Sequence, residues 1–196
     1  ERDFKRVIEN EDNLNNALIL MEADNSRTFH YIEQSSIQSL FNCYYNKKAD
    51  QIYKMMLVLF KSKQPKDFYS GVLPSKEGTK KTFLEEHHIF PTNSNIGKNI
   101  IEKYASINDN IINNIANITL ITKETNTKRI SNKNPSVYIS EFLEEKRDLK
   151  QEDLFYEYLE THFINKVMVG YLLDNDFESF IISRTKLIYE YMNSLT

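Results

Sequence analysis

Apolar residues recur at helical spacing through the first third of the chain. Leu14, Leu18 and Met21 lie four and three residues apart, which is the pattern of an amphipathic helix. The pattern predicts helices over three ranges: 11–24, about 28–46 and about 49–62. We therefore expect residues 1–63 to form a helical N-terminal segment.

A stretch rich in glycine and proline follows at 64–80, and it predicts a linker or long loop that separates this segment from the rest. Beyond it, a short strand is expected within 82–91, ending at Pro91. A second strand is expected within 115–122, where β-branched residues are dense. A helix is expected at about 96–105, between the two strands.

Helical patterns return after the second strand and continue to the C-terminus. Pro135 suits the first turn of a helix that Ser131 or Asn134 would cap. Two amphipathic helices follow at 151–165 and 175–194, the second with Asp174 and Asn175 as caps. The predicted fold class is α+β and mostly α, with a core at 81–150 and C-terminal helices at 151–196 that pack on it.

Composition excludes several classes of protein. The chain has 196 residues, and its longest apolar run, at 55–60, is far shorter than the roughly 20 residues that span a bilayer. The N-terminus does not resemble a signal peptide, so a cytoplasmic location without membrane association is expected. One cysteine, Cys43, excludes a disulfide scaffold and a cysteine-based zinc site. The net charge of −3 gives no global sign of nucleic-acid binding.

Candidate chemistry centres on two adjacent histidines, His87 and His88, among four in the chain. Adjacent side chains on a strand point to opposite faces, so both cannot serve one ligand in a regular strand. One can bind a metal while the other acts separately. The alternative is a polar patch near a strand end, with no metal.

The residues around this pair form a longer pattern. The segment 88–91 reads H-I-x-P, Asn117 follows 29 residues after His88, and Asn126 follows nine residues after Asn117. With His87 in front, the pattern resembles the HNH motif of ββα-metal (His-Me finger) endonucleases. We therefore expect a ββα-metal finger within a helical domain.

The resemblance implies a role for each residue. His87 and Asn126 would be metal ligands, His88 the general base, and Asn117 the residue that braces the loop after the first strand. The implied cofactor is one divalent metal ion, Mg²⁺ in first place, with Mn²⁺ or another ion as alternatives. Glu86 is an alternative ligand if the register shifts by one residue. The sequence departs from compact members in having an insertion at 93–113 and no flanking cysteine pairs.

A narrower resemblance covers more of the chain. The runs at 115–121 and 130–138, and the tail at 161–188, are similar to the C-terminal nuclease domain of GmrSD-type restriction enzymes. The resemblance implies a DNA-cleaving module of a prokaryotic (bacterial or archaeal) restriction or anti-phage defence system. It also implies a partner within the same protein, an N-terminal ParB/sulfiredoxin-like nucleotide-binding sensor domain, which agrees with a chain that starts without Met.

Three cations near the second strand are candidates for contact with DNA phosphate: Lys128, Arg129 and Lys133. Arg129 would share a helical face with Asn126, three positions earlier; an ordinary solvated face is the alternative. His162 and Arg184 are expected to be structural, with a buried or interface acid as partner for Arg184. A single site cuts one strand, so double-strand cleavage would require a homodimer or two binding events.

Two other functions stay open at this stage. One is a catalytically degenerate HNH fold that binds nucleic acid or another protein. The other is a helical regulatory domain, for which His87 and Asn126 would lie far apart. RNA as substrate is a variant of the nuclease hypothesis.

Overall fold

The computed structural model describes residues 43–45, 51–73, 84–106, 108 and 110–194. The helix predicted at 11–24, nearly all of the one at 28–46, and residues 74–80 of the predicted linker lie outside this range. The described elements, in chain order, are α5 (Gln51–Ser62), β1 (Leu84–His88), α6 (Asn95–Tyr104), η1 (Ile111–Asn113), η2 (Ile115–Asn117), β2 (Ile118–Thr122), η3 (Thr125–Ile130), α7 (Pro135–Asp148), α8 (Glu152–Glu160), α9 (Lys166–Leu173) and α10 (Phe177–Asn193).

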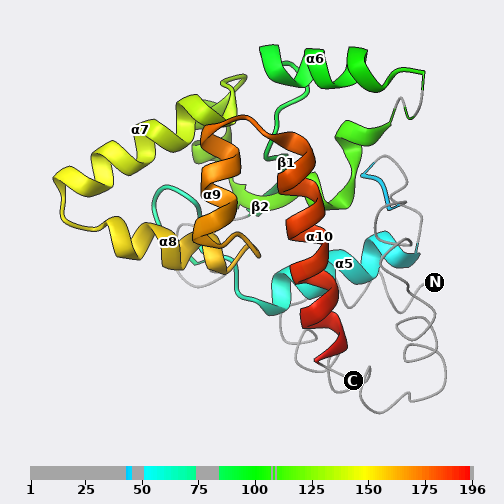
Figure 1. The fold of residues 1–196 in the computed structure, drawn as a ribbon. Helices are drawn as coiled ribbons and strands as arrows, with labels where there is room; N and C mark the ends of the chain where they lie inside the picture. Colours follow the sequence, from blue (N-terminus) through cyan, green and yellow to red (C-terminus); the bar gives the residue numbers. More distant parts are fainter. Residues whose placement is uncertain (1–42, 46–50, 74–83, 107, 109, 195–196) are drawn as a thin grey trace.

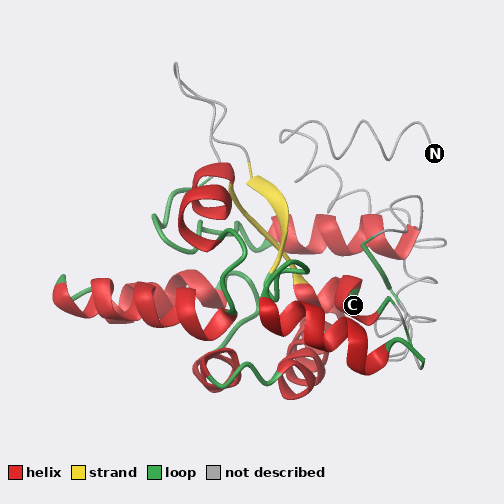
Figure 2. Cartoon of the chain, turned by 90° about the horizontal axis from the view of Figure 1, so that it is seen from above, coloured by secondary structure: helices red, strands yellow, loops and turns green. Residues whose placement is uncertain are grey.

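The described chain is α+β and mostly helical, as predicted, with the strands among the helices (Figures 1 and 2). β1 and β2 pair antiparallel, from Leu84 opposite Thr122 to His88 opposite Ile118. The second strand is shorter than the 115–122 predicted, because Ile115–Asn117 forms a turn of 3₁₀-helix. The side chain of Asn114 accepts from the backbone N–H of Ala116 and starts that turn.

The two faces of the sheet belong to two apolar clusters. Ile118 and Leu120 point to one face and pack with side chains of α5 and with Ile188 of α10. Ile121 points to the other face and packs in a cluster formed largely by α7, α8, α9 and α10. This alternation follows from the two-residue period of a strand, and it leaves both faces of the sheet covered.

The loop at 64–73 corrects the linker prediction. It contains no helix or strand, but Asp67 and Phe68 are fully buried in it. Phe68 packs in the same cluster as Ile121, and α5 packs against β2 in the other cluster. Chain segments before and after this loop therefore share their cores, so the loop is not a boundary between separate domains.

The C-terminal helices follow the prediction with three differences, the first being that α8 ends at Glu160 and not at 165. α7 begins at Pro135 after Asn134, and α10 ends at Asn193. The cap of α10 is Asp176, whose side chain accepts from the N–H of Ser179, and not Asp174 or Asn175. α9 was not predicted, because its apolar residues lie all round the helix. Within the described ranges, no helix is both long and apolar enough to cross a membrane.

Candidate metal and general-base site

His87 and His88 lie at the end of β1 and point to opposite faces of the sheet. His87 is opposite Thr119 in the ladder, whereas His88 is opposite Ile118. His87 is 6% exposed, and His88 is half-buried. The two imidazoles therefore have different surroundings although their backbones are consecutive.

The structure brings His87 together with Asn126, which lies in the first turn of η3. Burial and the adjacent His88 lower the pKa of His87 to about 3, and a hydrogen bond with the Asn126 side chain opposes this shift. His87 is therefore neutral at pH 7, the state in which an imidazole binds metal. Its buried Nε2 has no hydrogen-bond partner among the described residues. A buried, neutral imidazole nitrogen without a hydrogen-bond partner can act as a ligand for a divalent cation.

His88 is oriented by Asn113, a residue that the sequence did not indicate. The distance between His88 Nε2 and Asn113 Oδ1 is 2.9 Å. Asn113 Nδ2 donates to Asn110 Oδ1, so Oδ1 is the atom that faces the imidazole. His88 Nε2 therefore carries the proton, and Nδ1 is the basic nitrogen. Burial lowers the pKa of His88, against the hydrogen bond that Nε2 donates to Asn113, and keeps the ring neutral at pH 7.

Asn117 is fully buried and holds the loop that follows β1. Its Oδ1 accepts from Phe90 N at 2.8 Å, and its Nδ2 donates to Phe90 O at 3.2 Å and Ile112 O at 2.8 Å. Its backbone oxygen accepts from Ile89 N. These contacts fix the residues directly after His88, as expected for a bracing asparagine.

The insertion at 93–113 forms α6 and supports the same loop. Ser94 caps α6 by accepting from Gly97 N, and its hydroxyl donates to Pro91 O. A Cβ on Gly97 would lie 2.1 Å from Pro91 O, so only glycine permits this close approach. Tyr138 of α7 donates to Ile89 O on the other side of the loop.

Glu86, the alternative ligand, lies on the face opposite His87. It is paired with Leu120 in the ladder, and its carboxylate accepts from the Tyr53 hydroxyl at 2.8 Å. The Tyr53 ring belongs to the cluster around α5. The Glu86 carboxylate therefore points away from the side of the sheet on which His87 contacts Asn126.

Each of the three candidate DNA-binding cations has a glutamate partner. Lys128 pairs with Glu124 at 2.9 Å, Lys133 with Glu141 at 2.5 Å, and Arg129 with Glu145. The Arg129 guanidinium also lies 3.8 Å from the centre of the Tyr69 ring.

The expectation that Arg129 shares a face with Asn126 is wrong, because η3 is a π-helix. The N–H of Ser131 donates to Asn126 O, a bond between residues five apart. This wider turn rotates position 129 away from the direction of position 126. Contact between Arg129 and DNA stays a prediction.

Arg184 of α10 is fully buried and holds the backbone on both sides of Asn117. Its guanidinium donates to Ala116 O at 2.6 Å, Ile118 O at 2.8 Å and His162 O. Burial lowers its pKa to about 9. The sequence predicted an acidic partner; the partners are backbone carbonyls, which a periodic pattern of side chains does not reveal.

His162 is also buried, and it joins β2 to the loop at 64–73. Its Nε2 donates to Lys66 O at 2.5 Å, so its Nδ1 accepts from the Thr119 hydroxyl at 2.7 Å. Burial is the main reason why its pKa falls to about 3. The structural role predicted for His162 agrees with these contacts.

We expect the free energy of unfolding to fall as the pH drops from 6.5 towards 3. The unfolded chain binds protons at His87 and His162 in this range and the folded chain does not, so folding releases protons and acid opposes it. Each histidine contributes up to about 1.4 kcal/mol per pH unit. Urea denaturation between pH 5 and 7 measures this slope. The His162→Asn variant should have a shallower slope, and an unchanged slope would contradict the role of His162.

Comparison with known proteins adds one relative. The chain is 32% identical over 187 residues to "Uncharacterized protein MJ0686" of Methanocaldococcus jannaschii. The match covers 85% of this chain and 30% of that protein, so the chain spans about a third of the relative's length. No protein-family model matches the chain. No solved structure matches it.

Proposed function

We propose that this chain is a metal-dependent HNH endonuclease domain that hydrolyses DNA phosphodiester bonds, with β1, β2 and η3 as its ββα-metal finger. The observation that carries the proposal is the contact between the Asn126 side chain and that of His87, a ring whose buried Nε2 has no hydrogen-bond partner among the described residues. The brace from Asn117 to Phe90 supports it independently. The sequence resemblance suggests a restriction or anti-phage defence system as the setting.

The residues divide the reaction between them. His87 and the Asn126 amide would hold one divalent cation, Mg²⁺ or Mn²⁺, which when bound polarises the phosphate and stabilises the leaving 3′-oxygen. His88 would accept a proton at Nδ1 from the water that attacks phosphorus. Its Nε2 would keep its own proton, which it donates to Asn113 Oδ1. Asn117 would keep the His88 loop in position for this transfer.

DNA would be bound through its phosphates, with Lys128, Arg129 and Lys133 as the proposed contacts. Lys128 and its partner Glu124 are both highly exposed, so their ion pair is weak and Lys128 can exchange it for a phosphate. Arg129 is held more firmly, between Tyr69 and Glu145. DNA is therefore one proposed partner. The sequence resemblance adds a sensor domain of the same protein, and double-strand cleavage would add a second copy of the chain.

Removal of divalent metal should abolish cleavage of DNA by this chain. Supercoiled plasmid and phage DNA would be incubated with the protein in Mg²⁺, in Mn²⁺ and in EDTA, and nicked and linear products measured. We expect cleavage in metal, none in EDTA, and recovery when Mn²⁺ is added in excess. His87→Ala should need far more Mn²⁺ than the wild type, because one of the two ligands is lost.

Glu86→Gln is the matched control, because it removes a charge from the neighbouring residue on the opposite face. It should leave the Mn²⁺ requirement unchanged. Cleavage that persists in EDTA would contradict the proposal. If the protein binds DNA equally well with and without His87 and never cleaves it, the catalytically degenerate binding module would be the better description.

A further inference from the structure

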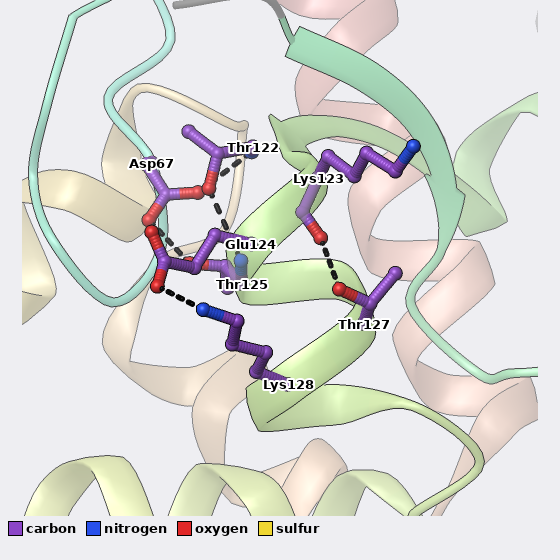
Figure 3. A network of polar contacts seen from close by, with 7 residues as sticks. All are labelled: Asp67, Thr122, Lys123, Glu124, Thr125, Thr127 and Lys128. Carbon is purple, nitrogen blue, oxygen red and sulfur yellow. Dashed lines mark hydrogen bonds and ion pairs between the residues drawn. The ribbon is translucent and has the colours of Figure 1, made fainter.

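The buried carboxylate of Asp67 lies against the junction between β2 and η3. One of the residues that it contacts there, Thr125, directly precedes Asn126. Its Oδ1 accepts from Thr122 N at 2.7 Å, and its Oδ2 accepts from the Thr125 hydroxyl, also at 2.7 Å. Figure 3 shows Asp67 facing these two residues from the neighbouring loop. The carboxylate thus bonds the last residue of the strand and the first residue of η3.

The same carboxylate is anchored within its own loop. Oδ2 also accepts from the backbone N–H of Ser70 at 3.0 Å and from its hydroxyl at 2.8 Å. The preceding residue, Lys66, is fixed by its own contacts: its oxygen accepts from His162, and its N–H donates to the Thr161 hydroxyl. Asp67 therefore connects a firmly held loop to the turn that carries Asn126.

Within the turn, Thr122 and Thr125 are bonded to each other as well. The Thr125 N–H donates to the Thr122 hydroxyl at 3.2 Å. The other local contacts of η3 in Figure 3, from Thr127 to Lys123 and from Lys128 to Glu124, do not involve Asp67. Among the contacts shown there, Asp67 is the connection from this turn to another part of the chain.

We propose that Asp67 is a positioning residue that sets the direction of the Asn126 side chain and thereby the affinity of the site for its divalent cation. This inference rests on the proposed function, because it assumes that His87 and Asn126 bind metal. The start of η3 is held through Thr125, so loss of that bond allows the turn to shift relative to β1, which carries His87. Groups that orient metal ligands typically change metal affinity by about 10–100-fold when they are removed.

Two hydroxyls bonded to the same carboxylate oxygen provide a matched test. Thr125→Val removes the bond that reaches η3, whereas Ser70→Ala removes a bond within the loop. Mn²⁺ binding to the full chain would be measured from the electron paramagnetic resonance signal of free Mn²⁺, with thermal unfolding measured alongside. We expect a dissociation constant at least 10-fold higher for Thr125→Val, and values within about threefold of the wild type for Ser70→Ala and Thr125→Ser.

Equal Mn²⁺ affinity for Thr125→Val and Ser70→Ala would overturn the role of Asp67 and leave the proposed function intact. No Mn²⁺ binding by the wild type would overturn both. If Thr125→Val does not fold, Thr125→Ala against Ser70→Ala gives the same comparison. Weaker binding by Thr125→Val together with normal binding by Thr125→Ser would support the proposal, because only the hydroxyl distinguishes their contact with Asp67.

Discussion

Replacement of His88 by alanine should reduce the rate of DNA cleavage by on the order of 10²–10⁴-fold, the usual contribution of a general base. The variant loses Nδ1, the nitrogen that the Asn113 contact leaves basic. Mn²⁺ binding should be unchanged, because the proposed ligands are His87 and Asn126 and not His88. Single-turnover cleavage of a short duplex at saturating Mn²⁺ measures the rate.

Two further measurements distinguish lost chemistry from lost structure. Imidazole added to His88→Ala should restore part of the rate, because it can replace the missing base. In the wild type the rate should fall only below pH 6.5, since the pKa of His88 lies under its ordinary value and the neutral form is the active one. A His88→Ala variant as active as the wild type would disprove the assignment.

Replacement of Arg184 by methionine should lower the free energy of unfolding by about 3 kcal/mol or more, because three buried carbonyls lose their donor at about 1–3 kcal/mol each. Methionine fills similar space but leaves the carbonyls of Ala116, Ile118 and His162 without their donor in a buried region. Urea denaturation followed by circular dichroism measures the loss. Any folded fraction should also cleave DNA more slowly, because two of these carbonyls flank Asn117.

Arg147→Met is the control for this substitution. Arg147 is also a helical arginine, but its side chain is 69% exposed and pairs with Glu152 at the surface. Its removal should change the free energy of unfolding by less than about 0.5 kcal/mol. Similar losses for Arg184→Met and Arg147→Met would show that the buried guanidinium adds little stability.

Local patterns were sufficient for much of the fold. The strand at 84–88 and the helix at 95–104 lie in or close to the ranges predicted for them, and Pro91 and Pro135 marked the end of the first strand segment and the start of α7. The prediction failed where tertiary contacts decide the structure. The glycine- and proline-rich composition of 64–80 indicated a loop, but it could not show that Asp67 would be buried under β2.

The candidate site was also predictable only in part from the sequence. The resemblance to the HNH motif selected His87, His88, Asn117 and Asn126. In the structure His87 contacts Asn126, and Asn117 bonds the backbone directly after His88. Asn113 was missed because it lies in an insertion and because asparagine is common throughout this sequence. The π-helical turn at η3 was also not predictable, since its five-residue bonds depend on the way the chain leaves β2.

The register of β1 has a consequence for insertions and deletions. The strand is five residues long and alternates between two different environments, one around Asn126 and one around Asn113. A shift by one residue would bring His88 to the Asn126 side and Glu86 with it, while His87 would face Asn113. The two imidazoles would exchange their surroundings, and with them their proposed roles, although neither side chain is altered. Strand register therefore decides which imidazole lies on the Asn126 side and which on the Asn113 side.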